Sequence, residues 1–340
     1  MKPFTLFRCL SLVLITSLWL VSSCRRQVEV PLPALPTIQG KPTAATTGGT
    51  TVGTTGTNKI DFRVDLYVVD RSGRYVGGLV PGNFGITATN PSSFTYALTK
   101  LELVGQTAKA GGYSAMLLLD QSGSILTTDP QDLRIEASKI FLDYLGANDQ
   151  VALASFTEDY DDYVVLHQGF SRNRPAMKKT LDSLAKTEGG GTPLYYSSVL
   201  VSDYTAQYAP TTNKAVILFT DGQNDTYTTT SLTEAITNAK ARQTPLFTVG
   251  LSRNVNVTVL SQMANETGGA FFYAKDAEQL VTSFGTLGNL LRGSAQLYRT
   301  TWTASRRSGN WVRGNTIAET IRIALPNGDI IEAPFYVQVP

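Results

Sequence analysis

The strongest constraint on the fold is a repeating pattern between residues 111 and 293, where short apolar runs alternate with longer stretches of helical periodicity. Uninterrupted apolar runs are typical of parallel strands that are buried on both faces, and strand–helix alternation favours a doubly wound α/β domain with a mostly parallel sheet. The expected strands are 113–119, 151–156, 215–220, 245–251 and 270–273, with a short edge strand at 163–166. The expected helices are 130–146, 174–187, 195–208, 231–243, 256–267 and 276–292.

The segments on either side of this domain, 59–110 and 294–340, have the alternating pattern of half-buried strands. In the second segment, Asn327-Gly328 separates two alternating runs, which indicates a hairpin. Neither segment is long enough to form a full β-sandwich alone. Either the two segments pair into one small sandwich with the central domain inserted in it, or each is an independent β-extension.

Oxygen-bearing side chains follow two of the expected strands and one glycine-rich segment. The first apolar run ends in Asp120, followed by Ser122 and Ser124, and another ends in Asp221-Gly222. Thr192 follows three consecutive glycines. Open α/β sheets bind ligands at the carboxyl ends of their strands, so these side chains are candidates for one site. Carboxylate and hydroxyl oxygens suit a hard cation such as Mg²⁺ or Mn²⁺.

These three segments resemble the metal-ion-dependent adhesion site of von Willebrand factor A domains, which include integrin I domains. The resemblance covers about 180 residues and all five positions of the motif. It implies Mg²⁺, or Mn²⁺, in preference to Ca²⁺. It also implies direct ligation by Ser122 and Ser124, with Asp120 and Asp221 binding directly or through water and Thr192 binding in the high-affinity state. A partner carboxylate would complete the coordination, and the helix expected at 276–292 would be the one that shifts.

The N-terminus predicts export and lipid anchoring. Lys2 and Arg8 precede an apolar stretch that is too short to cross a bilayer, and small residues lead into Cys24. This pattern resembles the lipobox of bacterial lipoproteins, which implies cleavage of residues 1–23 and acylation of Cys24. Residues 24–58 are rich in Pro, then Thr and Gly, and we expect an extended, flexible tether. The expected location is the cell envelope, at the outer membrane or cell surface rather than the inner membrane.

The composition excludes several partner classes. Removal of residues 1–23 leaves equal numbers of basic and acidic residues, so no polyanion or nucleic-acid partner is indicated. The loop ending in Thr192 lacks the Gly-Lys-Ser/Thr sequence of a phosphate-binding loop, which argues against nucleotides. Because the lipobox resemblance implies that Cys9 is removed with the signal and that Cys24 is acylated, no disulfide is expected within the mature chain.

Other candidates have ordinary structural explanations. The acidic run of Glu158, Asp159, Asp161 and Asp162 could hold a second cation, although a solvated loop is the simpler interpretation. Asp225 could tune the metal site or lie in a surface turn. The single histidine, His167, has no partnered nucleophile in the sequence and is expected to be structural.

Three functions fit these expectations to different degrees. The first is a membrane-anchored, metal-dependent protein-binding module of adhesin or receptor type. The second is a structural or assembly subunit of an envelope complex that uses the metal as a staple. The third is a metal-assisted hydrolase, which ranks below the others because no general base stands out and no catalytic residue is predicted.

Overall fold

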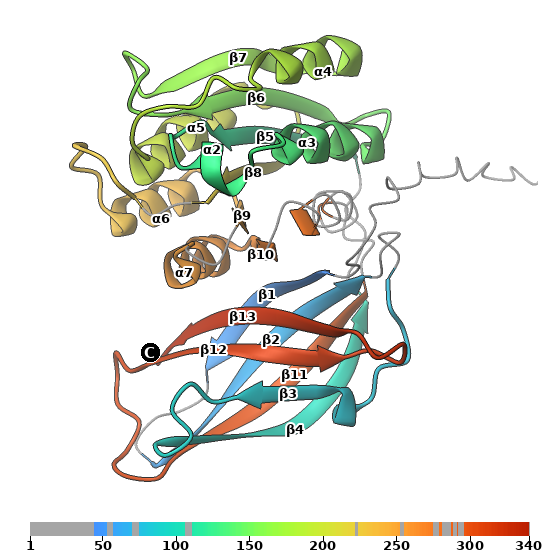
Figure 1. Ribbon diagram of the computed structural model, residues 1–340, viewed down its shortest axis with the longest axis vertical. Helices are drawn as coiled ribbons and strands as arrows, with labels where there is room; N and C mark the ends of the chain where they lie inside the picture. Colours follow the sequence, from blue (N-terminus) through green and yellow to red (C-terminus); the bar gives the residue numbers. More distant parts are fainter. Residues whose placement is uncertain are drawn as a thin grey trace, which may run out of the picture. The chain divides into compact units, whose positions relative to one another are not determined.

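Strand β5 (Tyr113–Asp120) lies inside the large sheet (Figure 1). It is buried along its whole length. In the computed structural model, Ala115, Leu117 and Leu119 belong to one hydrophobic cluster, whereas Met116 and Leu118 belong to another. Alternate side chains of a strand point to opposite faces, so a strand that is apolar on both faces needs a covering layer on each. The sequence of β5 therefore requires a sheet with helices on both sides.

The structure describes residues 44–52, 57–69, 75–105, 111–221, 224–251, 255–274, 279–280, 287, 291 and 296–339. These residues belong to one compact unit of the chain. No helix within these ranges is long and apolar enough to span a membrane. The predicted signal peptide, Cys24 and residues 24–43 of the predicted tether lie outside the described residues.

The expected doubly wound α/β domain is present. Five parallel strands lie in the order β10-β9-β8-β5-β6, and β7 pairs antiparallel with β6 at the edge. The bounds of the strands other than β5 are β6 (Gln150–Phe156), β7 (Val164–Ser171), β8 (Asn213–Thr220), β9 (Leu246–Leu251) and β10 (Ala270–Ala274). Along the chain, β5 leads to β6 on one side, whereas β8 lies on the other side of β5. The strand order therefore reverses between β5 and β8.

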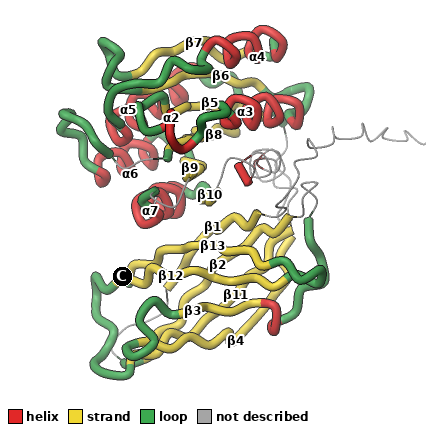
Figure 2. Tube along the Cα trace, viewed as in Figure 1, coloured by secondary structure: helices red, strands yellow, loops and turns green. Residues whose placement is uncertain are grey.

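Helices cover both faces of this sheet (Figure 2). The bounds are α2 (Ile125–Thr128), α3 (Leu133–Tyr144), α4 (Arg174–Ser183), α5 (Leu194–Tyr208), α6 (Leu232–Ala241) and α7 (Val257–Thr267). Phe141 of α3 and Met177 of α4 pack in the first cluster, whereas Val201 of α5, Ile236 of α6 and Met263 of α7 pack in the second. Of the helix expected at 276–292, only residues 279, 280, 287 and 291 are described, all as helical.

The segments on either side of the α/β domain pair with each other. This is the first of the two expected arrangements, in which the central domain is inserted between paired strands. The additional elements are β2 (Lys59–Val69), η1 (Pro81–Asn83), β3 (Phe84–Thr87), β4 (Phe94–Gly105), β11 (Gln296–Arg306), β12 (Thr316–Ala324) and β13 (Ile330–Gln338). Strand β11 lies between β2 and β4, and β12 lies between β3 and β13 in a second sheet. Phe62, Trp302 and Phe335 are buried in a shared core of these strands.

The prediction of a flexible tether over 24–58 is wrong for residues 44–52, which form strand β1 (Ala44–Val52). It pairs antiparallel with β2 on one side and with β10 on the other. The ten strands of the large sheet are therefore continuous, in the order β4-β11-β2-β1-β10-β9-β8-β5-β6-β7. Composition misled the prediction, because Thr and Gly are common in linkers but threonine also favours strands. Pairing on both sides supplies main-chain hydrogen bonds that need no apolar side chains.

Candidate metal centre

The site lies where the strand order reverses, at the carboxyl ends of β5 and β8 (Figure 1). These strands are parallel neighbours, with Leu119 paired to Phe219. Asp120 is the last residue of β5, and Asp221 directly follows β8. Register and topology therefore place both carboxylates at one edge of the sheet, in the crevice where open α/β sheets bind ligands.

Asp120 is fully buried and accepts hydrogen bonds with both carboxylate oxygens. Its Oδ1 accepts from the Ser122 backbone N–H at 2.8 Å, and its Oδ2 accepts from Thr220 Oγ1 at 2.6 Å. The first bond is the local turn that aspartate forms with its own backbone two residues on, and it bends the chain immediately after the strand. The second bond joins the ends of β5 and β8.

Two serine hydroxyls connect the carboxylates. Ser122 Oγ lies 3.1 Å from Ser124 Oγ, and Ser124 Oγ donates to Asp221 Oδ1 at 2.9 Å. Thr128 of α2 donates to the other Asp221 oxygen, Oδ2. Asp120, Ser122 and Asp221 are buried, whereas Ser124 is exposed, so the cluster opens to solvent on the Ser124 side.

The glycine-rich segment that precedes Thr192 is hydrogen-bonded to the loop after β5. The Gly189 N–H donates to Gln121 O at 2.8 Å, and the Gly123 N–H donates to Gly190 O at 3.0 Å. Gly190 has a φ of 70°, and a Cβ there would lie 2.6 Å from a carboxylate oxygen of Asp159. Only glycine fits that position. Thr192 is buried and exchanges backbone hydrogen bonds with Asp225, which ties its loop to the segment after β8.

Burial and mutual repulsion govern the charge of the two acids. Burial, together with the nearby charge of Asp221, raises the pKa of Asp120 to about 7. Burial also raises the pKa of Asp221, although hydrogen bonds from Thr128 and Ser124 oppose the shift. Two buried carboxylates at one point therefore carry an electrostatic cost, and a cation between them would relieve it.

The available donors fit a hard divalent cation. The five predicted residues offer only carboxylate and hydroxyl oxygens, which are ligands of Mg²⁺ and Mn²⁺ rather than of softer metals. Within the described ranges, no group of three or more His, Cys, Asp or Glu side chains could hold a metal ion. A cation at this edge would therefore depend on hydroxyl oxygens for most of its protein ligands.

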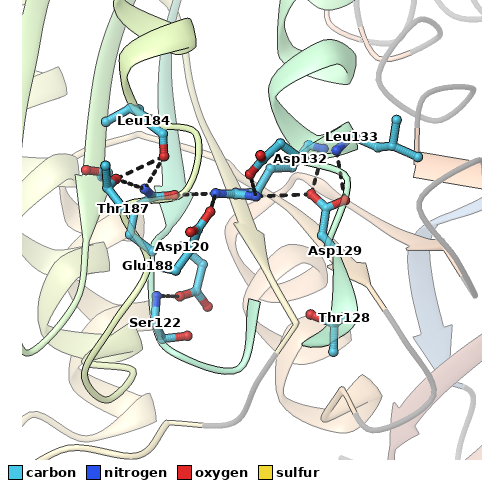
Figure 3. A network of polar contacts seen from close by, with 12 residues as sticks. Asp120, Ser122, Thr128, Asp129, Asp132, Leu133, Leu184, Thr187 and Glu188 are labelled. Carbon is cyan, nitrogen blue, oxygen red and sulfur yellow. Dashed lines mark hydrogen bonds and ion pairs between the residues drawn. The ribbon is translucent and has the colours of Figure 1, made fainter. Parts of the chain in front are cut away.

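A buried network behind the loops was not predicted from the sequence (Figure 3). Arg134, on α3, is fully buried among carboxylates. Its Nη2 donates to Gln121 Oε1 at 2.9 Å and to Glu188, and its Nη1 contacts Asp129 and Asp132. A polar residue within a helical pattern is normally solvated, so the sequence gives no signal that this arginine is internal.

The remaining candidates have structural roles in the described part of the chain. Glu158 Oε1 accepts from the Tyr227 N–H at 2.8 Å, so one member of the acidic run supports the loop after β8. His167 Nε2 lies 2.7 Å from the hydroxyl of Ser155, and burial lowers the pKa of His167. Ser155 is fully buried and so cannot reach a substrate as a nucleophile.

Comparisons with known proteins address the fold and the family. Among solved structures, the chain is similar to a von Willebrand factor type A protein from Catenulispora acidiphila, with 13% identity, a TM-score of 0.46, and coverage of 86% of this chain and 74% of that one. It is similar to proximal thread matrix protein 1 from the mussel byssus with a zinc occupied MIDAS motif, at 17% identity, a TM-score of 0.46, and coverage of 59% and 49%. It is also similar to the pilus adhesin SpaC from Lactobacillus rhamnosus GG, at 9% identity, a TM-score of 0.42, and coverage of 86% and 48%.

The chain spans about half the length of the mussel and pilus proteins that it matches. No curated protein matches its sequence significantly. The family model described as von Willebrand factor type A domain matches residues 116–286, which is half of the chain and includes all five predicted site residues. With this match and a parallel sheet flanked by helices, the chain belongs to the von Willebrand factor type A domain family.

Proposed function

We propose that this protein is a membrane-anchored module that binds another protein through a divalent cation. Asp120, Ser122, Ser124, Thr192 and Asp221 would hold the cation, and a carboxylate of the partner would complete its coordination. The observation that carries the proposal is the hydrogen-bonded chain from Asp120 through Ser122 and Ser124 to Asp221, across the ends of two parallel strands. Many members of this family bind proteins through such a metal-dependent site.

The donor set supports an open coordination position. Two carboxylates and three neutral hydroxyls leave little negative charge to spare after a divalent cation is neutralised. Mg²⁺ takes about six oxygen ligands and keeps waters readily, so one position remains for exchange with an acidic side chain. The exposure of Ser124 places that position on the solvent side of the cluster. We therefore propose Mg²⁺ or Mn²⁺ as the native ion.

Binding rather than catalysis is the proposed role. A metal-assisted hydrolase needs a general base within reach of the open position. Around the cluster, the described hydroxyls and acids are engaged with each other, and His167 bonds to a buried serine. We propose no catalytic residue.

Anchoring is proposed from the sequence alone. Cys24, after the short apolar stretch, would carry the lipid that holds the protein to the cell envelope, at the outer membrane or cell surface. Labelling of the expressed protein with a radioactive fatty acid, in wild type and in Cys24→Ser, would test it. Label on the wild type alone is the expected result.

Metal binding is tested by thermal unfolding with and without Mg²⁺ or Mn²⁺. A ligand that binds only the folded state at 100 times its Kd adds about 2.7 kcal/mol of stability, or about 5–10 °C in Tm for a domain of this size. Asp120→Ala with Asp221→Ala should abolish this shift. The metal-free variant should still fold, because the loss of the hydrogen bonds that the two carboxylates accept is partly offset by the removal of two repelling buried charges.

The matched control is Asp143→Ala with Asp203→Ala, which removes the same charge from ion pairs on the surfaces of α3 and α5. This variant should keep the full metal-dependent shift, since such pairs contribute about 0–1 kcal/mol each to stability. If metal and chelator give the same melting curve for the wild type, the proposed cation site does not exist.

A further inference from the structure

Arg134 connects three separate segments near the carboxyl ends of β5 and β8, the sheet edge with the proposed cation site, which we call the metal edge. Its own helix, α3, begins at Leu133, and Asp129 accepts from the backbone N–H groups of Leu133 and Arg134 at 2.8 and 2.9 Å. Its guanidinium then reaches Gln121, between two predicted metal ligands, and Glu188, which directly precedes the glycine-rich segment. The Arg134 side chain therefore contacts both loops that carry the proposed ligands.

The two loops also touch each other directly, through the Gly189 N–H to Gln121 O and the Gly123 N–H to Gly190 O. Gln121 is held from its other end as well, because its Nε2 donates to Leu184 O and to Thr187 Oγ1, both at 2.8 Å. The Gln121 side chain, with no exposed surface, therefore lies in a frame formed by Arg134 and the end of α4. These contacts fix the position of Gln121, and with it the backbone between Asp120 and Ser122.

General stability does not explain why the arginine is there. Buried ion pairs are costly to desolvate, and well-packed apolar residues often replace them without loss. Within the described part of the chain, Arg134 Nε and Glu188 Oε2 are buried without a hydrogen-bond partner, which adds to that cost. The planar fork of arginine binds the start of α3 through Nη1 and both loops through Nη2, with a fixed angle between the two nitrogens, and the compact ammonium of lysine has no such fork.

We propose that Arg134 is a positioning residue that holds the Gln121 loop and the Glu188–Thr192 loop in register, so that their oxygens lie ready for the cation before it binds. The proposal rests on the proposed function for its biological meaning, but not for the geometry that it predicts.

The first test is Arg134→Lys, which keeps the charge and removes the fork. Mn²⁺ affinity, measured by titration of the electron paramagnetic resonance signal of free Mn²⁺, should fall about 10-fold. This is the lower end of the range for residues that orient metal ligands from behind, because Arg134 acts through the backbone. In the metal-free protein, the Gly123 and Gly189 amides should exchange with solvent at least several-fold faster.

A second variant tests the same role without replacing Arg134, so the test does not depend on Arg134→Lys folding. Gln121→Met keeps every ion pair of Arg134 and removes the hydrogen bonds that join the Gln121 side chain to Arg134, Leu184 and Thr187. Because the ion pairs remain, this variant should show the same two effects to a smaller degree. The matched control is Arg299→Lys, which disrupts the two-bond pair with Asp65 in the flanking strands, where the distances are 3.1 and 3.0 Å. This control should leave Mn²⁺ affinity and both amide exchange rates unchanged.

The outcomes separate this proposal from the proposed function. Wild-type Mn²⁺ affinity and amide exchange in folded Arg134→Lys and Gln121→Met would overturn the positioning role while leaving the cation site in place. If the wild type binds no Mn²⁺ but the two amides exchange faster in both variants, the metal-binding function fails and the positioning role stands. Equal acceleration in Arg299→Lys would also overturn it, since the effect would then be general destabilisation.

Discussion

Asp120 and Arg134 are both fully buried, although their charges are opposite and ionised groups are costly to remove from water. The cost is met differently in the two cases. Three carboxylates and an amide surround Arg134, whereas Asp120 has only hydroxyl and backbone donors. Burial, together with the nearby charge of Asp221, raises the pKa of Asp120, and its hydrogen bonds only partly oppose the shift. The carboxylates behind the loops therefore share a positive charge from Arg134, whereas the donors to Asp120 in front of the loops, where the cation is proposed, are neutral.

His167 gives a pH dependence that is separate from the metal. Burial lowers its pKa, so in the pH range below its ordinary value near 6.5 the unfolded chain binds a proton that the folded chain does not. This contribution to stability is complete above that value and is lost as the pH falls through the window. Urea unfolding at about pH 7.5 and about pH 5 should show a larger loss for the wild type than for His167→Gln. Equal losses would mean that His167 titrates normally in the folded protein.

Strand β1 is the element that joins the α/β domain to its flanking strands. It lies between β2 and β10 and exchanges hydrogen bonds with both, with a register shift between Gly48 and Thr50. Its sequence offers mainly Thr, Gly and Ala, so its stability depends on backbone pairing more than on buried apolar surface. A residue without a backbone N–H should therefore be poorly tolerated there.

Thr47→Pro tests this dependence, because Thr47 is paired on both sides, with Leu66 and with Phe271. Proline removes a ladder hydrogen bond and is confined to edge strands and bulges, so we expect a loss of about 3 kcal/mol in the free energy of unfolding, the size of its penalty inside regular structure. Thr229→Pro, in an exposed loop before α6, is the control and should change stability by less than about 0.5 kcal/mol. Equal stability of the two variants in urea would show that β1 is dispensable.

The secondary-structure elements differ in how well the sequence predicts them. Strands β5 and β8 were predicted because strands buried on both faces need uninterrupted apolar runs. Strand β1 was missed because a polar strand paired on both sides leaves no periodic signal. The five oxygen-bearing residues were recognisable from their strand and loop contexts, whereas Thr128 and Arg134 were not. Their contacts depend on how α2 and α3 fold back on the loops, which local sequence does not encode.

The metal edge of the molecule is acidic over several loops. Residues 120–133, 157–163, 188–193 and 221–231 contain ten aspartate and glutamate residues, and Arg134 pairs with three of them. Two large apolar side chains on these segments, Leu126 and Tyr227, are 57% and 93% exposed. The surface around the proposed cation therefore has a negative field with apolar contacts, although the chain without residues 1–23 is neutral overall.

This field predicts a preference among acidic ligands. With Mn²⁺ bound, a peptide with one aspartate between lysines should bind at least about tenfold tighter at low salt than the same peptide with glutamates in place of lysines, and high salt should reduce the difference. Asp161→Asn with Asp162→Asn should reduce it as well. Asp143→Asn with Asp203→Asn, on helices outside these loops, should not. Equal affinities for the two peptides at low salt would exclude electrostatic selection of the partner.

The placement of β1 has a mechanical consequence for an anchored protein. Because β1 is antiparallel to β10, its first residue, Ala44, lies toward the carboxyl end of β10, the same edge of the sheet that carries Asp120 and Asp221. Tension between a lipid at Cys24 and a captured partner would enter at Ala44 and cross the sheet laterally from β1 through β10, β9 and β8. The chain itself continues from β1 through β2, β3 and β4 to β5, so the flanking strands would form a second, covalent route for the same load.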